Sequence, residues 1–410
     1  MTHLAVNGDR LWRSLMELAE IGATPAGGVC RLALTEVDRD GRDWLRRQAQ
    51  ASGLDVQVDS LGNMFLRRAG AREAPAVLVG SHIDSQPSGG KFDGTFGVLA
   101  GLEIIRVLNE TGTVTERPIE VVAWTNEEGS RFLPVMAGSG VFSGVYDANV
   151  VLDSRSNDGA RFGDELKAIG YAGELVPGAR QLAAYLEAHI EQGPVLEAHD
   201  CTIGVVSGAL GQIWFEVEIT GFEAHAGPTP MELRKDALQA AAEIISGIES
   251  IGRVHPESRA TVGMMSVWPN SRNVIPGRVQ FSVDLRHADM AGRNEMAENF
   301  RELVTRVCKR RSVDFTIRKT NDWNPMAFDA DLVGRVRQSA ADRDYSYRDL
   351  VSGAGHDAVY MARVCPTAMV FIPCKDGVSH NELEDARSDH IEAGANVLLD
   401  CVLDLARAIP

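Results

Sequence analysis

Two adjacent carboxylates close one apolar run of the chain, and a His-x-Asp triplet closes another. Glu127 and Glu128 follow the first run, and His82 and Asp84 belong to the second. Side chains at the carboxyl ends of strands meet at one edge of an open α/β sheet, where such folds place their active sites. Imidazole and carboxylate groups gathered there are suitable ligands for divalent ions. The spacing therefore predicts a two-metal hydrolase.

A third carboxylate belongs to the same stretch of chain. Asp93 lies eleven residues after His82 and is flanked by Gly90 and Gly94, so the backbone is free to turn sharply there. Such a carboxylate could bridge two cations. It could equally be the N-cap of a helix expected to begin near Thr95.

Two further histidines complete the candidate ligand set. His189 lies on the polar face of an expected strand, and His380 lies in a loop-like stretch before the last helix. Each residue alone has an ordinary interpretation: His82 as a hydrogen-bonded strand-end histidine, and Glu127 with Glu128 as a solvated acidic turn. Together, a set of three histidines and two carboxylates suits two ions such as Zn²⁺ or Mn²⁺. The candidate ligands are His82, Asp93, Glu128, His189 and His380. Glu127 then stays free as a general base.

Hydrophobic periodicity predicts two domains, one inserted into the other. Up to about residue 208, helical windows alternate with short apolar runs, which is typical of α/β organisation with parallel strands. Between 211 and 324 the order becomes strand, helix, strand, strand, helix, strand, which suggests a ferredoxin-like domain. The α/β pattern then returns. We therefore expect a discontinuous catalytic domain, 1–210 and 325–410, with a second domain, 211–324, inserted into it.

The expected elements follow from the same patterns. In the first domain they are strands at 76–79, 119–124 and 367–372, a strand around His189, and helices at 95–109, 332–341 and 389–408. In the inserted domain they are strands at 213–219, 260–267, 278–286 and 313–319, and helices at 236–251 and 292–309.

Composition limits the possible functions. The chain has 410 residues, 44% of them hydrophobic and 24% charged, which is a globular composition. Its net charge of −16 argues against nucleic acid or anionic membrane as a partner and favours a small-molecule or peptide substrate. The six cysteines are scattered and form no C-x-x-C pair, and the N-terminus shows no secretory pattern. We therefore expect a cytoplasmic protein with reduced thiols.

Five segments together resemble the hydantoinase/carbamoylase amidases, a branch of the dinuclear zinc aminopeptidase superfamily. This branch contains N-carbamoyl-L-amino-acid hydrolases, β-ureidopropionases and allantoate amidohydrolases. The segments are 80–94 (GSHIDSQPSGGKFDG), 125–132 (TNEEGSRF), 189–194 (HIEQGP), 224–231 (AHAGPTPM) and 352–358 (SGAGHDA). With the His380 segment these motifs are spread from Gly80 to Glu382, so the resemblance covers essentially the whole chain.

The resemblance implies a fold and a set of site residues. The fold is α/β, with a mixed-sheet zinc-aminopeptidase-like catalytic domain and an inserted ferredoxin-like α+β lid and dimerisation domain. Two divalent ions per subunit are implied, Zn²⁺ first, with Mn²⁺, Co²⁺ or Ni²⁺ as alternatives. The implied ligands are His82 and His189 for one ion and Glu128 and His380 for the other, with Asp93 bridging, Glu127 as general base and Asp84 as an outer-shell residue. A histidine at position 189, where related peptidases usually have a carboxylate, favours the amidase side of the superfamily.

The resemblance also implies how substrate is bound. The substrate is a small-molecule carboxylate, held by Gln192, Asn273, Arg286, Ser352 and Gly353. In a homodimer, His225 reaches the active site of the other subunit and polarises the scissile carbonyl. An arginine fork matches a carboxylate well, and so acidic a chain needs a local cation to hold an anion.

The implied reaction is hydrolysis of the carbamoyl C–N bond of N-carbamoyl-amino acids to amino acid, CO₂ and ammonia. The substrate could be an N-carbamoyl-L-amino acid or N-carbamoyl-β-alanine. Alternatives are an allantoate amidohydrolase, a dipeptidase and a non-catalytic metal-binding scaffold.

Overall fold

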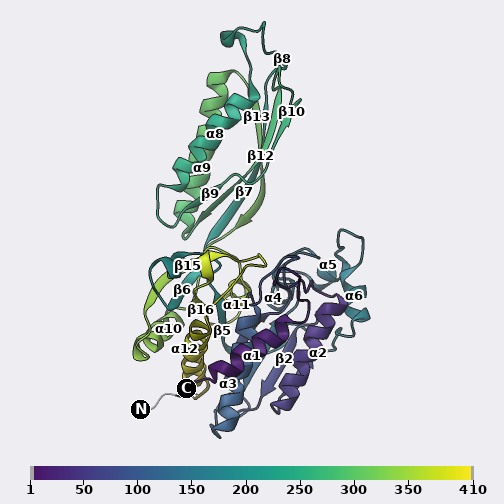
Figure 1. The fold of residues 1–410 in the computed structure, drawn as a ribbon, viewed down its shortest axis with the longest axis vertical. Coiled ribbons are helices and arrows are strands. Elements are labelled where there is room, and N and C mark those ends of the chain that lie inside the picture. Colours follow the sequence, from purple (N-terminus) through teal and green to yellow (C-terminus); the bar gives the residue numbers. More distant parts are fainter. Residues whose placement is uncertain (1–3, 408–410) are drawn as a thin grey trace. The chain divides into compact units, whose positions relative to one another are not determined.

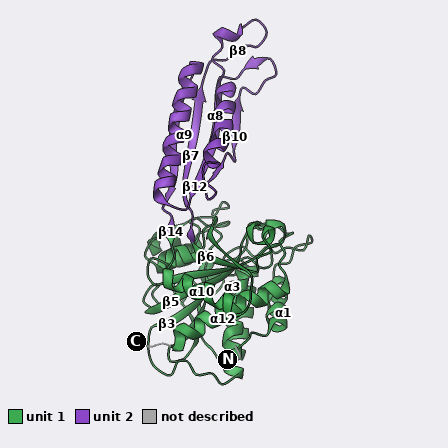
Figure 2. Ribbon diagram, turned by 90° about the vertical axis from the view of Figure 1, so that its left-hand side faces the viewer, with its two compact units in different colours: residues 1–207, 327–410 green, residues 208–326 purple. Residues whose placement is uncertain are grey.

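The computed structural model describes residues 4–407 and divides into two compact units. The first comprises Met1–Ser207 and Ala327–Pro410, and the second comprises Gly208–Met326 (Figure 2). The catalytic and lid roles expected for the segments 1–210 with 325–410 and 211–324 remain predictions. Among the described residues, no helix is both long and apolar enough to cross a membrane.

The first unit is built on one mixed sheet. Its strands run in the spatial order β1 (Asp55–Val58), β2 (Met64–Arg68), β4 (Ile119–Trp124), β3 (Ala76–His82), β5 (Leu182–Ile190), β16 (Thr367–Ile372) and β6 (Ile203–Ala209). β15 (Tyr347–Ser352) also pairs with β6, and β14 (Met326–Ala327) spans the boundary between the units. The four strands β4, β3, β5 and β16 are mutually parallel, whereas β1, β2 and β6 run antiparallel to their neighbours. The mixed sheet expected from the resemblance is therefore present.

Parallel pairing explains both the strand sequences and the position of the polar residues. β3, β4 and β16 are buried on both faces, so their sequences are continuously apolar over most of their length. His82 is in register with Trp124, and His189 with Phe371. The carboxyl ends of these strands, with the polar residues in and after them, therefore lie at one edge of the sheet.

Helices pack on this sheet (Figure 1). The longer ones are α1 (Gly8–Ala19), α2 (Glu36–Ala51), α3 (Thr95–Glu110), α10 (Ala330–Asp342) and α12 (Ser388–Arg407); α3 contacts β3 and β5, and α12 contacts β16 and β5. Shorter helical segments are α4 (Ala137–Phe142), α5 (Ala148–Asp153), α6 (Phe162–Ala168), α7 (Val195–Ala198), α11 (Asp357–Met361) and η2 (Lys375–Gly377). Helix α3 is buried on nearly every side, and its glycines Gly97 and Gly101 lie close to backbone and side chains of the sheet. The last helix expected from sequence ends at Ala408, which lies outside the described residues.

The second unit is a ferredoxin-like layer of antiparallel strands and two helices. The strand order is β10 (Met265–Trp268), β12 (Arg278–His287), β7 (Gly211–Thr220) and β13 (Asp314–Trp323), with β9 (Arg259–Thr261) also on β12. Helices α8 (Ala237–Gly252) and α9 (Met290–Arg311) pack against one face. A separate ribbon of β8 (Ala224–His225) and β11 (Val274–Ile275) lies beyond the end of β7. The short helix η1 (Met231–Leu233) follows β8 in the chain.

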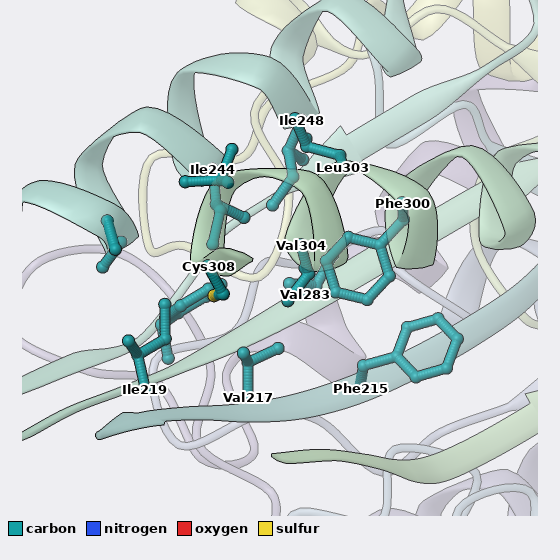
Figure 3. Packing of buried hydrophobic residues seen from close by; sticks show 14 of the residues in the cluster. Phe215, Val217, Ile219, Ile244, Ile248, Val283, Phe300, Leu303, Val304 and Cys308 are labelled. Carbon is teal, nitrogen blue, oxygen red and sulfur yellow. The ribbon is translucent and has the colours of Figure 1, made fainter. Parts of the chain in front are cut away.

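This unit has its own hydrophobic core. Alternate residues of β7, among them Phe215 and Val217, point to the helices and meet Ile244 of α8 and Phe300 of α9 (Figure 3). The intervening Trp214 and Glu216 are exposed. This alternation of period two is what predicted a half-buried strand.

One expected strand is wrong. Residues 260–267 do not form a single strand but two short ones, β9 and β10, on the same partner, β12. The chain leaves the ladder between them, where Ser282 of β12 accepts a hydrogen bond from the Met264 amide through its side chain and donates its own amide to the Met264 carbonyl. A glycine at 263 permits such an irregularity, which alternation of side chains alone does not reveal.

Candidate metal centre

The structure brings all five candidate metal ligands of the first unit to one edge of the sheet. His82 ends β3, His189 is the penultimate residue of β5, and Glu128 follows β4. Asp93 comes from the segment before α3, and His380 from the loop after β16. Segments almost 300 residues apart in sequence thus supply one cluster, because parallel strands end together.

Asp93 belongs to two groups of ligand atoms. Its Oδ1 lies 3.0 Å from His189 Nε2 and 3.6 Å from His82 Nε2. Its Oδ2 lies 3.2 Å from His380 Nε2, which is itself 3.3 Å from Glu128 Oε2. The ligand atoms of each group lie within 4.8 Å of one another. The Asp93 carboxylate is therefore shared by two groups of three residues, an arrangement that can hold a pair of cations.

Backbone carbonyls orient two of the imidazole rings. His82 Nδ1 lies 2.9 Å from the Asp84 carbonyl oxygen, and His189 Nδ1 lies 2.8 Å from the Ile190 carbonyl oxygen. A proton on Nδ1 leaves the lone pair of Nε2 directed at Asp93. Both rings are thus held in the tautomer that a metal ligand needs.

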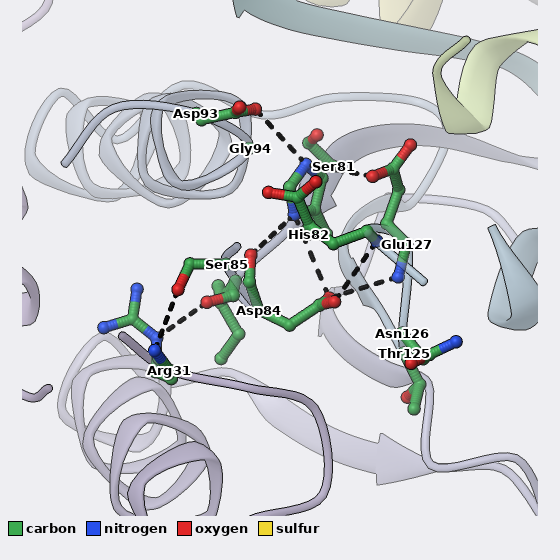
Figure 4. Close-up of polar contacts among 12 residues, drawn as sticks. Arg31, Ser81, His82, Asp84, Ser85, Asp93, Gly94, Thr125, Asn126 and Glu127 are labelled. Carbon is green, nitrogen blue, oxygen red and sulfur yellow. Dashed lines mark hydrogen bonds and ion pairs between the residues drawn. The ribbon is translucent and has the colours of Figure 1, made fainter. Parts of the chain in front are cut away.

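Asp84 contacts the His82 ring through its backbone carbonyl and not through its carboxylate. Its carboxylate lies 3.9 Å from His82 Nδ1, too far for a hydrogen bond, and the carbonyl of the same residue makes that contact instead. The carboxylate accepts from the backbone amide of Glu127 at 3.2 Å (Figure 4). It also accepts from the backbone amide of Glu128 at 3.2 Å. One residue therefore positions the imidazole through its backbone and the two glutamates through its side chain.

Glu127 and Glu128 are buried and point to different partners, so the interpretation as a solvated acidic turn does not hold. Their exposed fractions are 9% and 8%. Glu127 Oε2 lies 3.6 Å from His82 Nε2, whereas Glu128 accepts from the Gln86 side chain at 2.7 Å and faces His380. Glu127 therefore lies beside the ligand cluster while its neighbour is part of it.

Burial dominates the electrostatics of these carboxylates. It raises the pKa of Glu127 well above its usual value against the opposing effect of His82. It also raises the pKa of Glu128 to about 7, and Asp93 adds to this shift. Burial opposes protonation of His82, but the neighbouring Glu127 and Asp93 carboxylates outweigh it and raise the pKa of the imidazole. Protons and any divalent cation bound here would therefore compete for the same atoms.

The segment carrying Asp93 does not use this carboxylate as a helix cap. The N-cap of α3 is Gly94, with φ of 66°, and no side chain caps the helix. A Cβ at Gly94 would lie 2.4 Å from the His82 ring. Glycine is thus required both by the backbone conformation and by the close approach of the ligand.

Three of the predicted substrate-binding residues lie in the first unit. Gln192 donates from Nε2 to Asp93 Oδ2 at 2.9 Å, so it contacts the centre directly. Ser352 ends β15 and its Oγ lies 3.0 Å from His356 Nε2. The ring of His356 lies 4.5 Å from that of His189, so Ser352 and the adjoining Gly353 are linked to the centre through a buried histidine. Burial and the nearby His189 hold the pKa of His356 well below its ordinary value.

The other predicted residues lie in the second unit, at opposite ends of it. His225 pairs with Val274, and the Asn273 carbonyl accepts from the Ala226 amide at 2.8 Å, so His225 and Asn273 are neighbours in the β8–β11 ribbon. Arg286 lies near the other end of β12, paired with Asp284 at 2.8 Å. It lies eight positions along the strand from Arg278, the ribbon end of β12, which is about 27 Å. One copy of this unit therefore does not bring His225 and Arg286 together.

Sequence reasoning missed three buried residues that contact this region. Arg31 is 1% exposed and donates from Nε to the Ile83 carbonyl at 2.6 Å, between His82 and Asp84. Glu187 accepts from Ser81, Tyr185 and the Ala358 amide. Glu384 contacts the Asp93 backbone. No local sequence pattern indicates Arg31. Glu187 could have been noticed as a charged residue inside an apolar strand, and Glu384 as an acidic residue shortly after His380.

The donor set fits two divalent cations. Imidazole nitrogens and carboxylate oxygens are suitable ligands for Zn²⁺ and for Mn²⁺. Two of the three imidazoles have Nδ1 at a carbonyl, and Asp93 offers one oxygen to each group. The same geometry does not select one metal over another.

Comparison with known proteins identifies the relatives of this chain. Residues 78–404 match the Peptidase family M20/M25/M40. The chain is 46% identical to an N-carbamoyl-L-amino-acid amidohydrolase of Rhizobium meliloti over 98% of both chains. It is 34% identical to an allantoate amidohydrolase of Bacillus subtilis over 95% of both chains. A crystal structure of a hydantoinase/carbamoylase family amidase from Burkholderia multivorans is 55% identical, covers 99% of this chain and 100% of its own, and superposes with a TM-score of 0.97.

Proposed function

The chain belongs to the Peptidase family M20/M25/M40, and on that premise we propose that it is an amidohydrolase of N-carbamoyl-amino acids. The reaction adds water to the carbamoyl carbon and breaks its C–N bonds, so that one ureido group yields the free amino acid, CO₂ and ammonia. N-carbamoyl-L-amino acids are the first substrates to consider, because the 46% identical relative has that name.

The observation that carries the proposal is the position of Asp93 between two ligand groups with Glu127 beside them. We assign His82 and His189 to one divalent ion and Glu128 and His380 to the other. Bound ions of this kind polarise a carbonyl oxygen and acidify a water molecule. Zn²⁺ is our first choice, with Mn²⁺, Co²⁺ or Ni²⁺ as alternatives.

Glu127 has the properties of the general base. It is buried next to the cluster, and its own backbone amide and that of Glu128 donate to the Asp84 carboxylate. A carboxylate beside the cluster that is not itself a ligand can take a proton from the attacking water and return it to the leaving nitrogen. Such a residue has no use in a scaffold that only binds metal, which is why we favour an enzyme.

We assign the substrate carboxylate to Arg286 and Asn273, assisted by Gln192, Ser352 and Gly353. His225 would polarise the scissile carbonyl from a second subunit of a homodimer. The length of the second unit supports this assignment, because Arg286 lies about 27 Å along β12 from the strand end next to the ribbon that carries His225. A single active site that uses both residues needs two chains.

A cytoplasmic location completes the proposal. All six cysteines are free thiols, among them the buried Cys308, Cys365, Cys374 and Cys401. Reduced cysteines are typical of proteins kept in a reducing compartment.

The test is ammonia release from N-carbamoyl-L-amino acids, N-carbamoyl-β-alanine and allantoate. The protein is reconstituted with Zn²⁺ or Mn²⁺, and a chelator-treated sample is the control. We expect turnover of an N-carbamoyl-amino acid that chelation abolishes and added metal restores. Preferential turnover of allantoate would support the alternative to which the 34% identical relative points. No turnover of any of the three by protein holding two metals per chain would contradict the proposal.

A further inference from the structure

Glu384 is a buried carboxylate close to the candidate metal centre. Its exposed fraction is 3%. Its Oε1 accepts hydrogen bonds from the backbone amides of Phe92 at 2.9 Å and Asp93 at 3.1 Å. It therefore holds the backbone of the residue that lies between the two ligand groups.

The second oxygen of Glu384 reaches the loop that supplies another ligand. Ser379 Oγ lies 3.0 Å from Glu384 Oε2 and 3.2 Å from Asp93 Oδ2. Ser379 immediately precedes His380, whose φ of 52° is unusual for a residue other than glycine. One side chain thus connects the segment of Asp93 with the segment of His380, although 286 positions separate Asp93 from Ser379.

The neighbouring backbone leaves room for this carboxylate. A Cβ at Gly90 would lie 2.0 Å from the Glu384 carboxyl group. A side chain at position 90 would therefore displace Glu384 from the amides that it holds. The position of Glu384 therefore depends on a glycine at position 90, almost 300 residues away in sequence.

We infer that Glu384 is a positioning residue that fixes Asp93 and His380 relative to each other and thereby sets the affinity of the centre for divalent ions. The inference rests on the proposed metal-dependent function. Glu384 itself is not in either ligand group, and its oxygens are engaged by Phe92, Asp93 and Ser379. Groups that orient metal ligands in this way typically alter metal affinity by about 10–100-fold when they are removed.

The experiment is a calorimetric titration of chelator-stripped full-length protein with Mn²⁺. We expect Glu384→Ala to bind Mn²⁺ about 10–100-fold more weakly than the wild type. Glu384→Gln should stay close to the wild type, because an amide oxygen can still accept from both backbone amides. The matched control is Glu103→Ala, which removes a fully buried glutamate that accepts from Arg10 and the Asn7 amide elsewhere in the same unit. It should lower the thermal stability without weakening Mn²⁺ binding.

Two milder variants test the inference if Glu384→Ala does not fold. Gly90→Ala pushes the carboxylate away, and Ser379→Ala removes its link to the His380 loop; both should weaken Mn²⁺ binding. Gly334→Ala, where a Cβ meets nothing within 4 Å, is the control for the glycine change. Wild-type affinity in folded Glu384→Ala, or in both milder variants, would overturn the inference, as would equal weakening in Glu103→Ala. A wild-type protein that binds no Mn²⁺ or Zn²⁺ would instead overturn the proposed function and this inference with it.

Discussion

The carboxylate of Asp93 belongs to both candidate ligand groups, so its position decides whether the two groups can bind a pair of ions. Asp93 is held at its backbone by Glu384 and at its side chain by Gln192 and Ser379. Asp84 similarly holds Glu127 and Glu128. At the scale of single residues, the candidate centre is thus a small set of proposed ligands fixed by a second set of hydrogen-bonding groups.

Replacement of Glu127 by glutamine distinguishes the proposed role of Glu127 from that of Glu128. We expect Glu127→Gln to keep both metals and lose about 10²–10⁴-fold in kcat/KM, because the amide cannot accept a proton. Glu128→Gln is the matched control and should lower the metal content, since residue 128 faces His380 as a ligand. Steady-state kinetics and elemental analysis of the same samples measure both effects. Normal turnover by metal-loaded Glu127→Gln would show that another group is the base.

A methyl group at Gly94 should disturb the centre through His82. Gly94→Ala places a Cβ 2.4 Å from the imidazole, so we expect metal affinity to fall by about tenfold or more. Gly112→Ala is the control, because Gly112 follows the same helix with φ of 62° and a Cβ there meets nothing within 4 Å. Both changes should cost about 1 kcal/mol or more of backbone strain, but only the first should alter a Mn²⁺ titration. Equal affinities in the two variants would contradict this role of Gly94.

At the scale of elements, tight connections between strands carry buried polar groups of their own. Asp59 lies in the turn between β1 and β2 and accepts from the amides of Leu61 and Asn63 and from the Asn63 side chain. Asn63 in turn accepts from the Thr125 amide, two residues before Glu127. The turn therefore helps to hold the segment that carries the two glutamates.

The Asp59 turn makes the stability of the first unit depend on pH. Burial raises the pKa of Asp59 from 3.8 to about 6, so the folded chain holds this proton more tightly than the unfolded chain does. The contribution of Asp59 to the free energy of unfolding is fully present below about pH 4. It is lost as the pH rises through 6, and the loss is about 3 kcal/mol in total. We expect Asp59→Asn to be less stable than the wild type in acid and to gain on it between pH 4 and 7. Urea unfolding of both proteins across this range measures the difference; a difference that does not change with pH would contradict the shift.

Elements with a strong local signal could be predicted from the sequence, and the others could not. The strand at 119–124 was predicted with the bounds that β4 has, because both of its faces are buried and five of its six residues are apolar. β15 was missed, since the sequence YRDLVS begins with exposed polar residues and pairs at the side of the sheet. Its existence depends on pairing with β6, which no local pattern records.

The residues of the candidate site also divide into those that could be predicted from the sequence and those that could not. The ligands could be proposed because each has the right chemistry and follows or ends a recognisable strand, as His82 and Glu128 do. Arg31 could not be proposed, because its partner is a backbone carbonyl more than 50 positions away. Hydrogen bonds to the backbone leave no signature in the identity of the partner residue.

At the scale of the whole molecule, the second unit places two predicted functional regions at its opposite ends. His225 and Asn273 lie at the ribbon beyond β7, and Arg286 lies near the end of β12 next to the chain's connections to the first unit. A composite site formed by two chains would use both ends of the unit at once. It would also make catalysis depend on the concentration of chains.

Subunit mixing tests this arrangement. Glu127→Gln and His225→Ala proteins should each be nearly inactive alone, but their heterodimer would contain one site with both residues intact. With random exchange of subunits in a C₂ dimer, about one quarter of the wild-type sites is expected to be restored. Activity is measured after exchange has been verified with differently tagged chains. No recovery would place His225 in its own chain's site or outside catalysis.

The discontinuous first unit has a consequence for the order in which the chain matures on the ribosome. β16 pairs with β5 on one side and β6 on the other, yet it is made about 180 residues after β5. At about 5–20 residues per second, the nascent chain would carry an unpaired β5 edge for on the order of ten seconds or more. The second unit is continuous in sequence and can complete its core in that interval. We therefore expect newly made first units, rather than second units, to be the clients of chaperones, and the metal centre to be completed only after His380 has emerged.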